Sequence, residues 1–209
     1  MPWPWAGQEL GRLLAVCPRL ACRTGAAHDA GDFPEAALLI VENGVVAIAS
    51  RAPAKRRIVL GFSSPGDVLP PPRLGEQLVA LRDSVLVSVN EDVQRRLLSL
   101  PAAAEAIVDS LVDVVRERQE SLAHFGTALH AERLRGKLLQ LARTHGSVVA
   151  DGVRVELPLT HELLAQTLGS ARETVTCSLR TLEQEGFVVR EGRRYRLAIS
   201  PSALDPDTA

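Results

Sequence analysis

The first half of the chain alternates short apolar segments with turn residues, a pattern typical of small β-barrels and jelly rolls. A short apolar helix is expected first, over Glu9 to Val16. Asn43-Gly44, between two apolar runs, predicts a β-hairpin with a type I′ turn, because both central residues of that turn need a positive φ. The predicted strands are Ala37 to Val41, Val45 to Ser50, Arg57 to Phe62, Gln77 to Leu81 and Val85 to Val89.

The apolar period changes to that of a helix at Asn90. Asn90 can cap a first helix, which carries Glu91 and Asp92 in its first turn, where acidic side chains suit the helix dipole. Pro101 then begins a longer helix at a position that needs no amide hydrogen.

Apolar residues of this longer helix recur at heptad-like steps interrupted at Arg118, which indicates a seam that needs a partner. The helix could cover the β-domain, or it could pair with the same helix of a second copy. Its length of over twenty residues without a helix breaker favours a parallel homodimer. The predicted dimerisation residues are Ile107, Leu111, Val114, Leu122 and Phe125.

The last third predicts a helix, a tight turn, a second helix and a β-hairpin over Leu157 to Leu197, which is the order of a winged helix-turn-helix. A further small hairpin is expected upstream at Asp151-Gly152. Caps and turns are expected at Thr160, Gly169, Ser170, Gly186 and Gly192.

The second of these helices has an apolar face and a polar face. Val175, Leu179 and Leu182 recur at steps of four and three and should face the core. The outward side then holds Arg172, Glu173, Thr176, Cys177 and Arg180. The first residues of such a helix reach base edges in the major groove, where arginine can pair with guanine and glutamate with cytosine. The alternative is that Ser170 and Glu173 form a capping box, so that Glu173 only satisfies backbone amides.

The run Leu159 to Val175, with Arg172-Glu173-Thr174-Val175 inside it, resembles the cyclic-AMP receptor protein/FNR (Crp/Fnr) family of bacterial transcription regulators. Leu60-Gly61-Phe62 with Pro65-Gly66-Asp67 is similar to a strand and turn of that family. The resemblance implies an α+β fold, with a cyclic-nucleotide-binding-like β-roll, a long dimerisation helix and a C-terminal winged helix-turn-helix. It also implies double-stranded DNA, a second copy of the chain and RNA polymerase as partners.

The resemblance implies roles for individual residues as well. The positions that match Arg172 and Glu173 read bases in the family, and the position that matches Thr174 contacts phosphate. The remaining expected DNA-binding residues are Thr160, His161, Ser170, Thr176 and Arg180.

The chain departs from the family's pattern at the effector site and on the second helix. Cys177 stands where a second base-reading arginine is common, and Ala171 stands where serine is usual, leaving Ser170 as the expected cap. Between Asp67 and the strand over Val85 to Val89 there is no room for the helix and Gly-Glu…Arg-Ser cassette that hold the phosphate of a cyclic nucleotide. We therefore do not expect cyclic AMP to be the ligand.

Other modes of control remain open. A phosphate-bearing effector such as a cyclic dinucleotide could bind the basic residues Arg51, Lys55, Arg56, Arg57 and Arg73. Cys17 and Cys22 could form a thiol-based redox sensor, since Arg19 and Arg23 could stabilise a thiolate. The third possibility is a regulator without an effector, governed by its abundance. Three cysteines are too few for a four-cysteine iron–sulfur site, and no cofactor or metal is expected.

Composition and charge agree with a folded regulator. The chain is 46% hydrophobic and 23% charged with a net charge of −1, and the basic charge collects in residues 131–200, with 11 basic against 8 acidic residues. Histidine spacing and the absence of a phosphate loop or GxSxG motif disfavour an enzyme. No membrane-length apolar run or signal peptide is present, so a cytoplasmic protein is expected. The expected domains are residues 1–100, 101–130 and 131–209.

Overall fold

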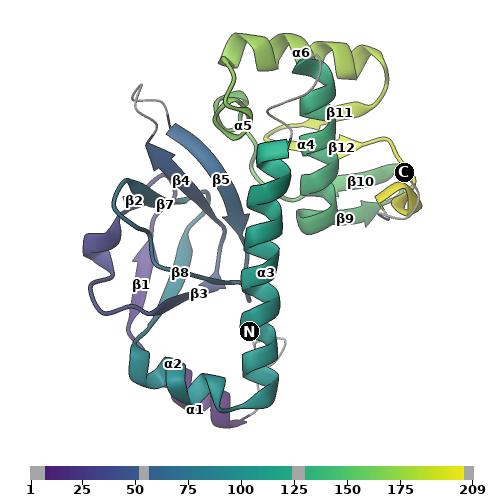
Figure 1. The fold of residues 1–209 in the computed structure, drawn as a ribbon. Coiled ribbons are helices and arrows are strands. Elements are labelled where there is room, and N and C mark those ends of the chain that lie inside the picture. The colour runs from purple at the N-terminus through teal and green to yellow at the C-terminus, as the bar shows by residue number, and fades with distance from the viewer. Residues whose placement is uncertain (1–7, 52–56, 124–129, 205–209) are drawn as a thin grey trace. The chain divides into compact units, whose positions relative to one another are not determined.

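The structure, a computed structural model, describes residues 8–51, 57–123 and 130–204 (Figure 1). The chain divides into two compact units, Met1–Gln119 and Glu120–Ala209, and the division falls inside the long helix α3 (Pro101–Ala123). The predicted α+β class is confirmed, because a β-domain, a long helix and a small helical domain with its own sheet follow one another along the chain. None of the helices in the described ranges is long and apolar enough to cross a membrane.

The first unit contains two four-stranded antiparallel sheets, with strand orders β1-β8-β3-β6 and β2-β7-β4-β5. All five predicted strands are present. The sequence prediction missed β1, β2 and β6, which have only two to four residues each and therefore show little periodicity. The strands are β1 (Arg19–Cys22), β2 (Ala27–His28), β3 (Leu38–Asn43), β4 (Val46–Arg51), β5 (Arg57–Ser63), β6 (Val68–Leu69), β7 (Glu76–Ala80) and β8 (Ser84–Val89).

The predicted hairpin at Asn43-Gly44 is wrong, because β3 and β4 lie in different sheets. The Asn43 side chain accepts a hydrogen bond from the Gly44 N–H, and Gly44 has a φ of +85°. A Cβ added at Gly44 would lie 2.1 Å from Ser84 Oγ and 2.5 Å from Asp83 O. The Asn-Gly pair therefore serves a crossing between the two sheets, where only glycine fits against the turn before β8.

Replacing Gly44 by alanine is expected to lower the free energy of unfolding by about 2–6 kcal/mol, since backbone strain and steric overlap each cost about 1–3 kcal/mol. Gly75→Ala is the matched control, because Gly75 has a similar φ of +87° but nothing within 4 Å of the added Cβ. Urea denaturation measures both variants. Equal losses in the two would show that the close approach at Gly44 has no energetic weight.

Alternate residues of β3 face two different parts of the core. Leu39 and Val41 point between the sheets, where they pack with Ile48 and Leu78 of the opposite sheet. Leu38 and Ile40 belong to a second cluster on the outer face of their sheet. Three helices cover that face: α1 (Gln8–Ala15), α2 (Glu91–Leu98) and the first half of α3. The capping prediction at Asn90 is confirmed, because its side chain accepts from the Val93 N–H.

Helix α3 lies on its own β-domain with two of the residues that were assigned to the dimer seam, Ile107 and Leu111. Ile107 is 3% exposed inside the second cluster, and Leu111 packs against that cluster. Ser110 Oγ accepts from the Val68 N–H at 2.7 Å and donates to Val68 O at 3.1 Å, which fixes the helix on β6. The assignment of Ile107 to the dimer interface is therefore corrected. Phe125 and the side chain of Leu122 lie outside the described part of the chain.

The Pro65-Gly66-Asp67 turn between β5 and β6 has a structural function. Gly66 has a φ of +101°, and its N–H donates to Val41 O. Asp67 Oδ2 accepts from the Ser64 N–H, while burial raises the pKa of the Asp67 carboxyl. This motif closes the turn between β5 and β6.

From residue 130 to residue 204, the second unit has three α-helices, a short 3-10 helix and a four-stranded antiparallel sheet with strand order β11-β12-β10-β9. The predicted hairpins at Asp151-Gly152 and Gly192 are both confirmed. The elements are α4 (His130–His145), β9 (Gly146–Val149), β10 (Gly152–Val155), α5 (His161–Leu168), α6 (Arg172–Gln184), β11 (Val188–Glu191), β12 (Arg194–Leu197) and the 3-10 helix η3 (Pro201–Leu204).

Candidate DNA-binding site

Helices α5 and α6 with the turn between them form the helix-turn-helix. Thr160 Oγ1 accepts from the Leu163 N–H at 3.1 Å, which confirms the predicted cap of α5. Gly169 ends α5 with a φ of 58°, a left-handed conformation that glycine adopts without cost. The chain therefore reverses over a very short distance into α6.

The predicted cap of α6 at Ser170 is wrong. Ala171 holds the N-cap position and makes no side-chain capping bond, while the Ser170 N–H donates to Ala165 O and continues the turn that ends α5. The capping box between Ser170 and Glu173 is not formed. Glu173 is exposed and has no hydrogen-bond partner among the described residues, so its carboxylate is available to a ligand.

The two faces of α6 are divided as predicted. Val175, Leu179 and Leu182 are 1%, 2% and 0% exposed. Among the predicted outward residues, Thr176 is half-buried. Within the described residues the guanidinium of Arg172 has no ion-pair or hydrogen-bond partner. The outward residues that are exposed are Arg172, Glu173, Cys177 and Arg180.

A chain of hydrogen bonds joins the start of α5 to the first turn of α6. His161 Nδ1 lies 2.9 Å from Thr176 Oγ1, and the Thr176 hydroxyl donates to Arg172 O at 2.9 Å. Burial, followed by the positive charges of Arg190 and Arg172, lowers the pKa of His161. The predicted DNA-binding residues His161, Thr176 and Arg172 thus form one group.

The β11–β12 hairpin carries arginines that sequence reasoning missed. Arg194 is paired with Glu156 at 3.0 Å and Arg196 with Glu191 at 2.9 Å, which compensates both charges. Arg193, beside the turn glycine Gly192, is exposed and has no partner among the described residues. The signal that could have identified Arg193 is its position next to Gly192, the turn glycine of the predicted hairpin.

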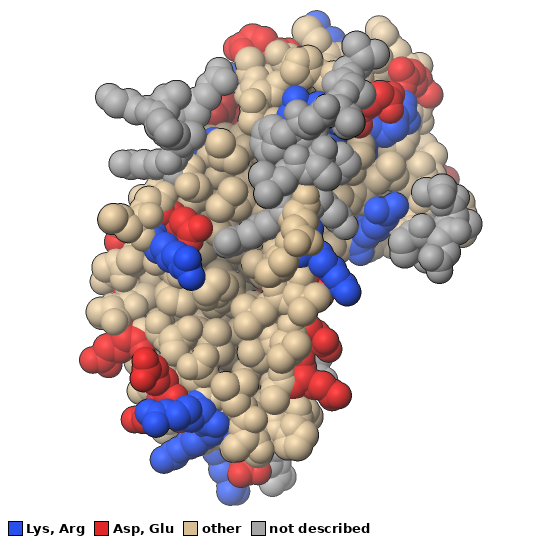
Figure 2. All heavy atoms as spheres, in the orientation of Figure 1, with Lys and Arg blue, Asp and Glu red and all other residues tan. Residues whose placement is uncertain are grey.

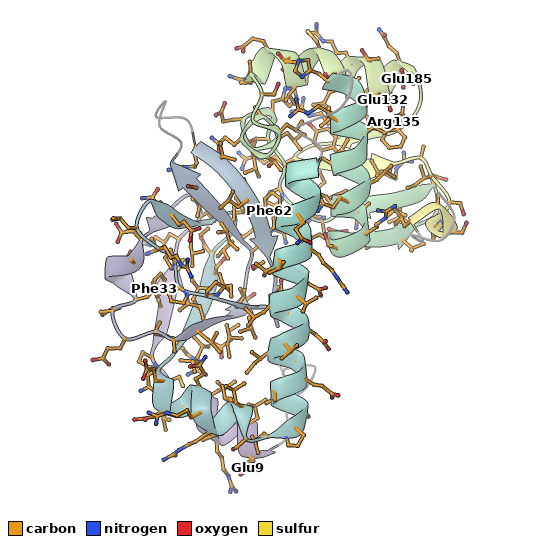
Figure 3. All side chains as sticks on the ribbon, viewed as in Figure 1. Glu9, Phe33, Phe62, Glu132, Arg135 and Glu185 are labelled. Atoms are coloured by element: carbon orange, nitrogen blue, oxygen red, sulfur yellow. The ribbon has the colours of Figure 1, made fainter. Side chains whose placement is uncertain are left out.

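Helix α4 holds the ends of α5 and α6. Arg133 Nη2 donates to Leu168 O, the last carbonyl of α5, at 2.6 Å. The Arg135 guanidinium lies 4.3 Å from the centre of the Phe187 ring, pairs with Glu185 and lies 3.6 Å from Glu132 (Figure 3). These contacts give α6 a rigid support within its unit.

Among the residues predicted to bind an effector, those that the structure describes lie near one end of the β2-β7-β4-β5 sheet, where Ser50 of β4 is opposite Glu76 of β7. Arg51 and Arg57 are opposite each other at the end of β4 and β5, whereas Lys55 and Arg56 lie outside the described residues. Arg73 is exposed on the connection from β6 to β7, where its N–H donates to the Glu76 carboxylate. Across the described ranges, no three His, Cys, Asp or Glu side chains are grouped to hold a metal ion.

Cys17 and Cys22 are buried in two different core clusters. Burial is the main reason why the pKa of each thiol is raised, although Arg19 opposes this at Cys17. A raised pKa lowers the thiolate fraction and with it the reactivity. Both observations argue against a redox sensor made of these two thiols.

Comparison with known proteins places this helix-turn-helix in a family. Residues 132–204 match the family model for the Crp-like helix-turn-helix domain. The nitrogen fixation regulation protein FixK of Azorhizobium caulinodans is 31% identical over 170 residues, which cover 79% of this chain and 68% of FixK. The chain belongs to the Crp/Fnr family of transcription regulators.

Further relatives extend the match over both units. A CRP-like cAMP-activated global transcriptional regulator of Mycobacterium tuberculosis (strain CDC 1551 / Oshkosh) is 29% identical over 78% of this chain and 76% of its own length. The structure of a CooA mutant from Carboxydothermus hydrogenoformans matches with a TM-score of 0.78 at 21% identity, covering 92% of this chain and 88% of CooA. This chain, as a member of the Crp/Fnr family, is a DNA-binding transcription regulator and not an enzyme.

Proposed function

We propose that this Crp/Fnr regulator binds a palindromic operator as a homodimer and reads bases with Arg172 and Glu173. The observation that carries the proposal is that both side chains, at the first residues of α6, are exposed and have no partner among the residues that the structure describes. Arginine can donate two hydrogen bonds to guanine, and a carboxylate can accept from the amino group of cytosine. Two copies related by a twofold axis would read two inverted half-sites.

Selection of bound fragments from genomic DNA, followed by sequencing, tests this function. The expected result is a shared inverted repeat whose complex survives competitor DNA at raised salt, since specific contacts persist when phosphate attraction weakens. Fragments without a shared sequence would contradict sequence-specific binding.

Phosphate contacts are assigned to residues around the base-reading pair. Thr160 caps α5, Ser170 lies in the turn before α6, Thr174 and Arg180 lie on α6, and Arg193 adds a charge at the wing. Such contacts orient the protein on DNA without reading sequence.

Replacing Arg193 by alanine is therefore expected to weaken binding to operator and to unrelated DNA by a similar factor. It should also reduce the slope of log affinity against log salt by about one per protomer, because one phosphate contact fewer releases one counterion fewer. Titrations at several salt concentrations measure this slope. Loss of binding to the operator alone would instead place Arg193 at a base.

The proposed dimer interface is a row of exposed valines on α3. Val108, Val112 and Val115 are 55%, 39% and 52% exposed and recur at steps of four and three. Leu122 lies seven residues after Val115, so it continues the same heptad position. Figure 2 shows mainly uncharged surface along the described part of α3, with charged residues to one side. This row replaces the one that contains Ile107, which the β-domain already covers.

Control of this protein is proposed not to involve cyclic AMP. The connection from β6 to β7, residues 70–75, contains no helix and begins with three prolines, which offer no amide hydrogens to a phosphate. Fully buried side chains of both sheets, among them Leu39 and Leu86 of one sheet and Leu78 of the other, fill the space between the sheets. A regulator without an effector, governed by its abundance, fits these observations best.

Cyclic AMP is accordingly expected to leave operator affinity unchanged. A ligand shifts a protein between DNA-binding and non-binding states only by its differential affinity for them. Calorimetry with cyclic AMP and operator titrations with and without it measure the two quantities. Stoichiometric cyclic AMP binding together with tighter operator binding would contradict the proposal.

A further inference from the structure

The hydrogen bonds of His161 determine which ring nitrogen carries the proton. The Thr176 hydroxyl has one hydrogen, which it donates to Arg172 O. At 2.9 Å from the same oxygen, Nδ1 of His161 must therefore be the donor to Thr176. In the neutral ring the other nitrogen, Nε2, then has a free lone pair, and no described residue bonds to it.

The charges that face His161 favour this neutral form while DNA is absent. Arg190 on β11 and Arg172 on α6 repel a proton on the ring, whereas Glu183 on α6 attracts one. His161 is also the first residue of α5, where the helix dipole disfavours a cation. Burial lowers the pKa of His161, as the two arginines do, and together these effects outweigh the opposite effect of Glu183.

Building on the proposed DNA-binding function, we propose that His161 is a positioning residue for Arg172 and that the protein takes up a proton at His161 when it binds DNA. Nδ1–H donates to Thr176 in both protonation states, so the connection to the first turn of α6 remains. A proton gained on Nε2 adds a donor that can bond to a phosphate oxygen of the DNA. The phosphate supplies the negative charge that the free protein lacks at this point.

The direction of the pH effect follows from proton uptake. The complex holds more protons than the free protein, so operator affinity rises as the pH falls. Each proton taken up changes affinity by at most about tenfold per pH unit. His145 does not contribute near neutral pH, because burial and then Lys137 lower its pKa to about 4. Among the described residues of this unit, His130 is the remaining histidine and is exposed, which makes it the control.

The experiment measures operator affinity at about pH 6 and about pH 8 at one salt concentration, with an operator taken from the selection experiment. Wild-type protein is expected to bind about threefold to tenfold more tightly at the lower pH. His161→Asn keeps an N–H donor for Thr176 but cannot take up a proton, so its affinity should be the same at both pH values. His130→Asn should behave as wild type.

Thr176→Val tests the positioning role separately. The variant should lose about twofold to tenfold in discrimination between the operator and an unrelated fragment, the usual effect of one lost hydrogen bond. Its affinity should still rise at low pH. Calorimetry in buffers of different ionisation enthalpy should show net proton uptake for wild type and none for His161→Asn.

The results of these experiments separate failure of the proton uptake, failure of the positioning role and failure of the proposed function. A flat pH profile in wild type that binds its operator specifically overturns this inference alone, as does His161→Asn with a wild-type profile. Unchanged discrimination in Thr176→Val overturns the positioning role. If wild type binds no DNA sequence specifically, the proposed function fails and this inference fails with it.

Discussion

Replacing Arg172 by alanine is expected to remove most of the preference for the operator while the dimer and the fold remain. A bidentate contact from arginine to guanine contributes about 1–3 kcal/mol of discrimination. A twofold operator contains two such contacts, so the loss is about 2–6 kcal/mol, or about 30-fold to 20,000-fold in affinity. Because the side chain is exposed and without partners among the described residues, its removal leaves the core intact. Anisotropy titrations with operator and scrambled DNA measure the loss.

Two arginine variants serve as controls for this measurement. The side chain of Arg95 on α2 is 72% exposed. Arg95→Ala therefore tests the effect of losing one positive charge at a position far from α6 in sequence. Arg193→Ala should weaken operator and scrambled DNA together. An Arg172→Ala protein that binds its operator as wild type does would remove the recognition role from α6.

Sequence reasoning located the helix-turn-helix well because its signals are local. Thr160 and Gly169 act through bonds and backbone angles within a few residues, and the apolar face of α6 follows from helical periodicity alone. Ser170 was misassigned because its spacing to Glu173 allows a cap that competes with the turn after α5. Which bond forms depends on how tightly the two helices are joined, and spacing alone does not contain that information.

The errors in the first unit concern contacts that are distant in sequence. Asn43-Gly44 has the local signature of a hairpin, but β3 pairs with β6 and β8, and β4 pairs with β5 and β7, so the two strands do not pair with each other. Gly44 is required by Asp83 and Ser84, about forty residues away in sequence, so no local pattern could identify its role. The missed strands β1, β2 and β6 are likewise held by pairing rather than by their own periodicity.

In helix α3, too, a local sequence pattern could not predict a contact between distant residues, and here the contact bears on function. Its sequence contains two apolar rows offset by one residue, one with Ile107, Leu111 and Val114 and one with Val108, Val112 and Val115. Both rows have the spacing of a helix seam, so periodicity cannot say which row faces the β-domain. The structure assigns Ile107 and Leu111 to the β-domain and leaves the three valines exposed.

Replacing Val112 by aspartate is expected to convert the protein to monomers and thereby to abolish tight operator binding. A carboxylate buried without a partner in an apolar interface costs about 3 kcal/mol or more, and a symmetric dimer contains two. The dissociation constant of the dimer should then rise by about 20,000-fold or more. Sedimentation velocity at micromolar concentration measures the change, and operator binding should fall with it, since a monomer contacts one half-site only.

The control is Val148→Asp, which makes the same substitution at a valine that is 68% exposed on β9, outside the row on α3. The Val148→Asp protein should remain dimeric, because an exposed carboxylate stays hydrated and its introduction carries no desolvation cost. Leu111→Asp should instead lower the free energy of unfolding, since Leu111 packs on the core of its own unit. If Val112→Asp stays dimeric while Leu111→Asp becomes a folded monomer, the row with Ile107 would be the interface after all. Monomeric wild type would exclude the dimer altogether, and a palindromic operator would then have no structural basis.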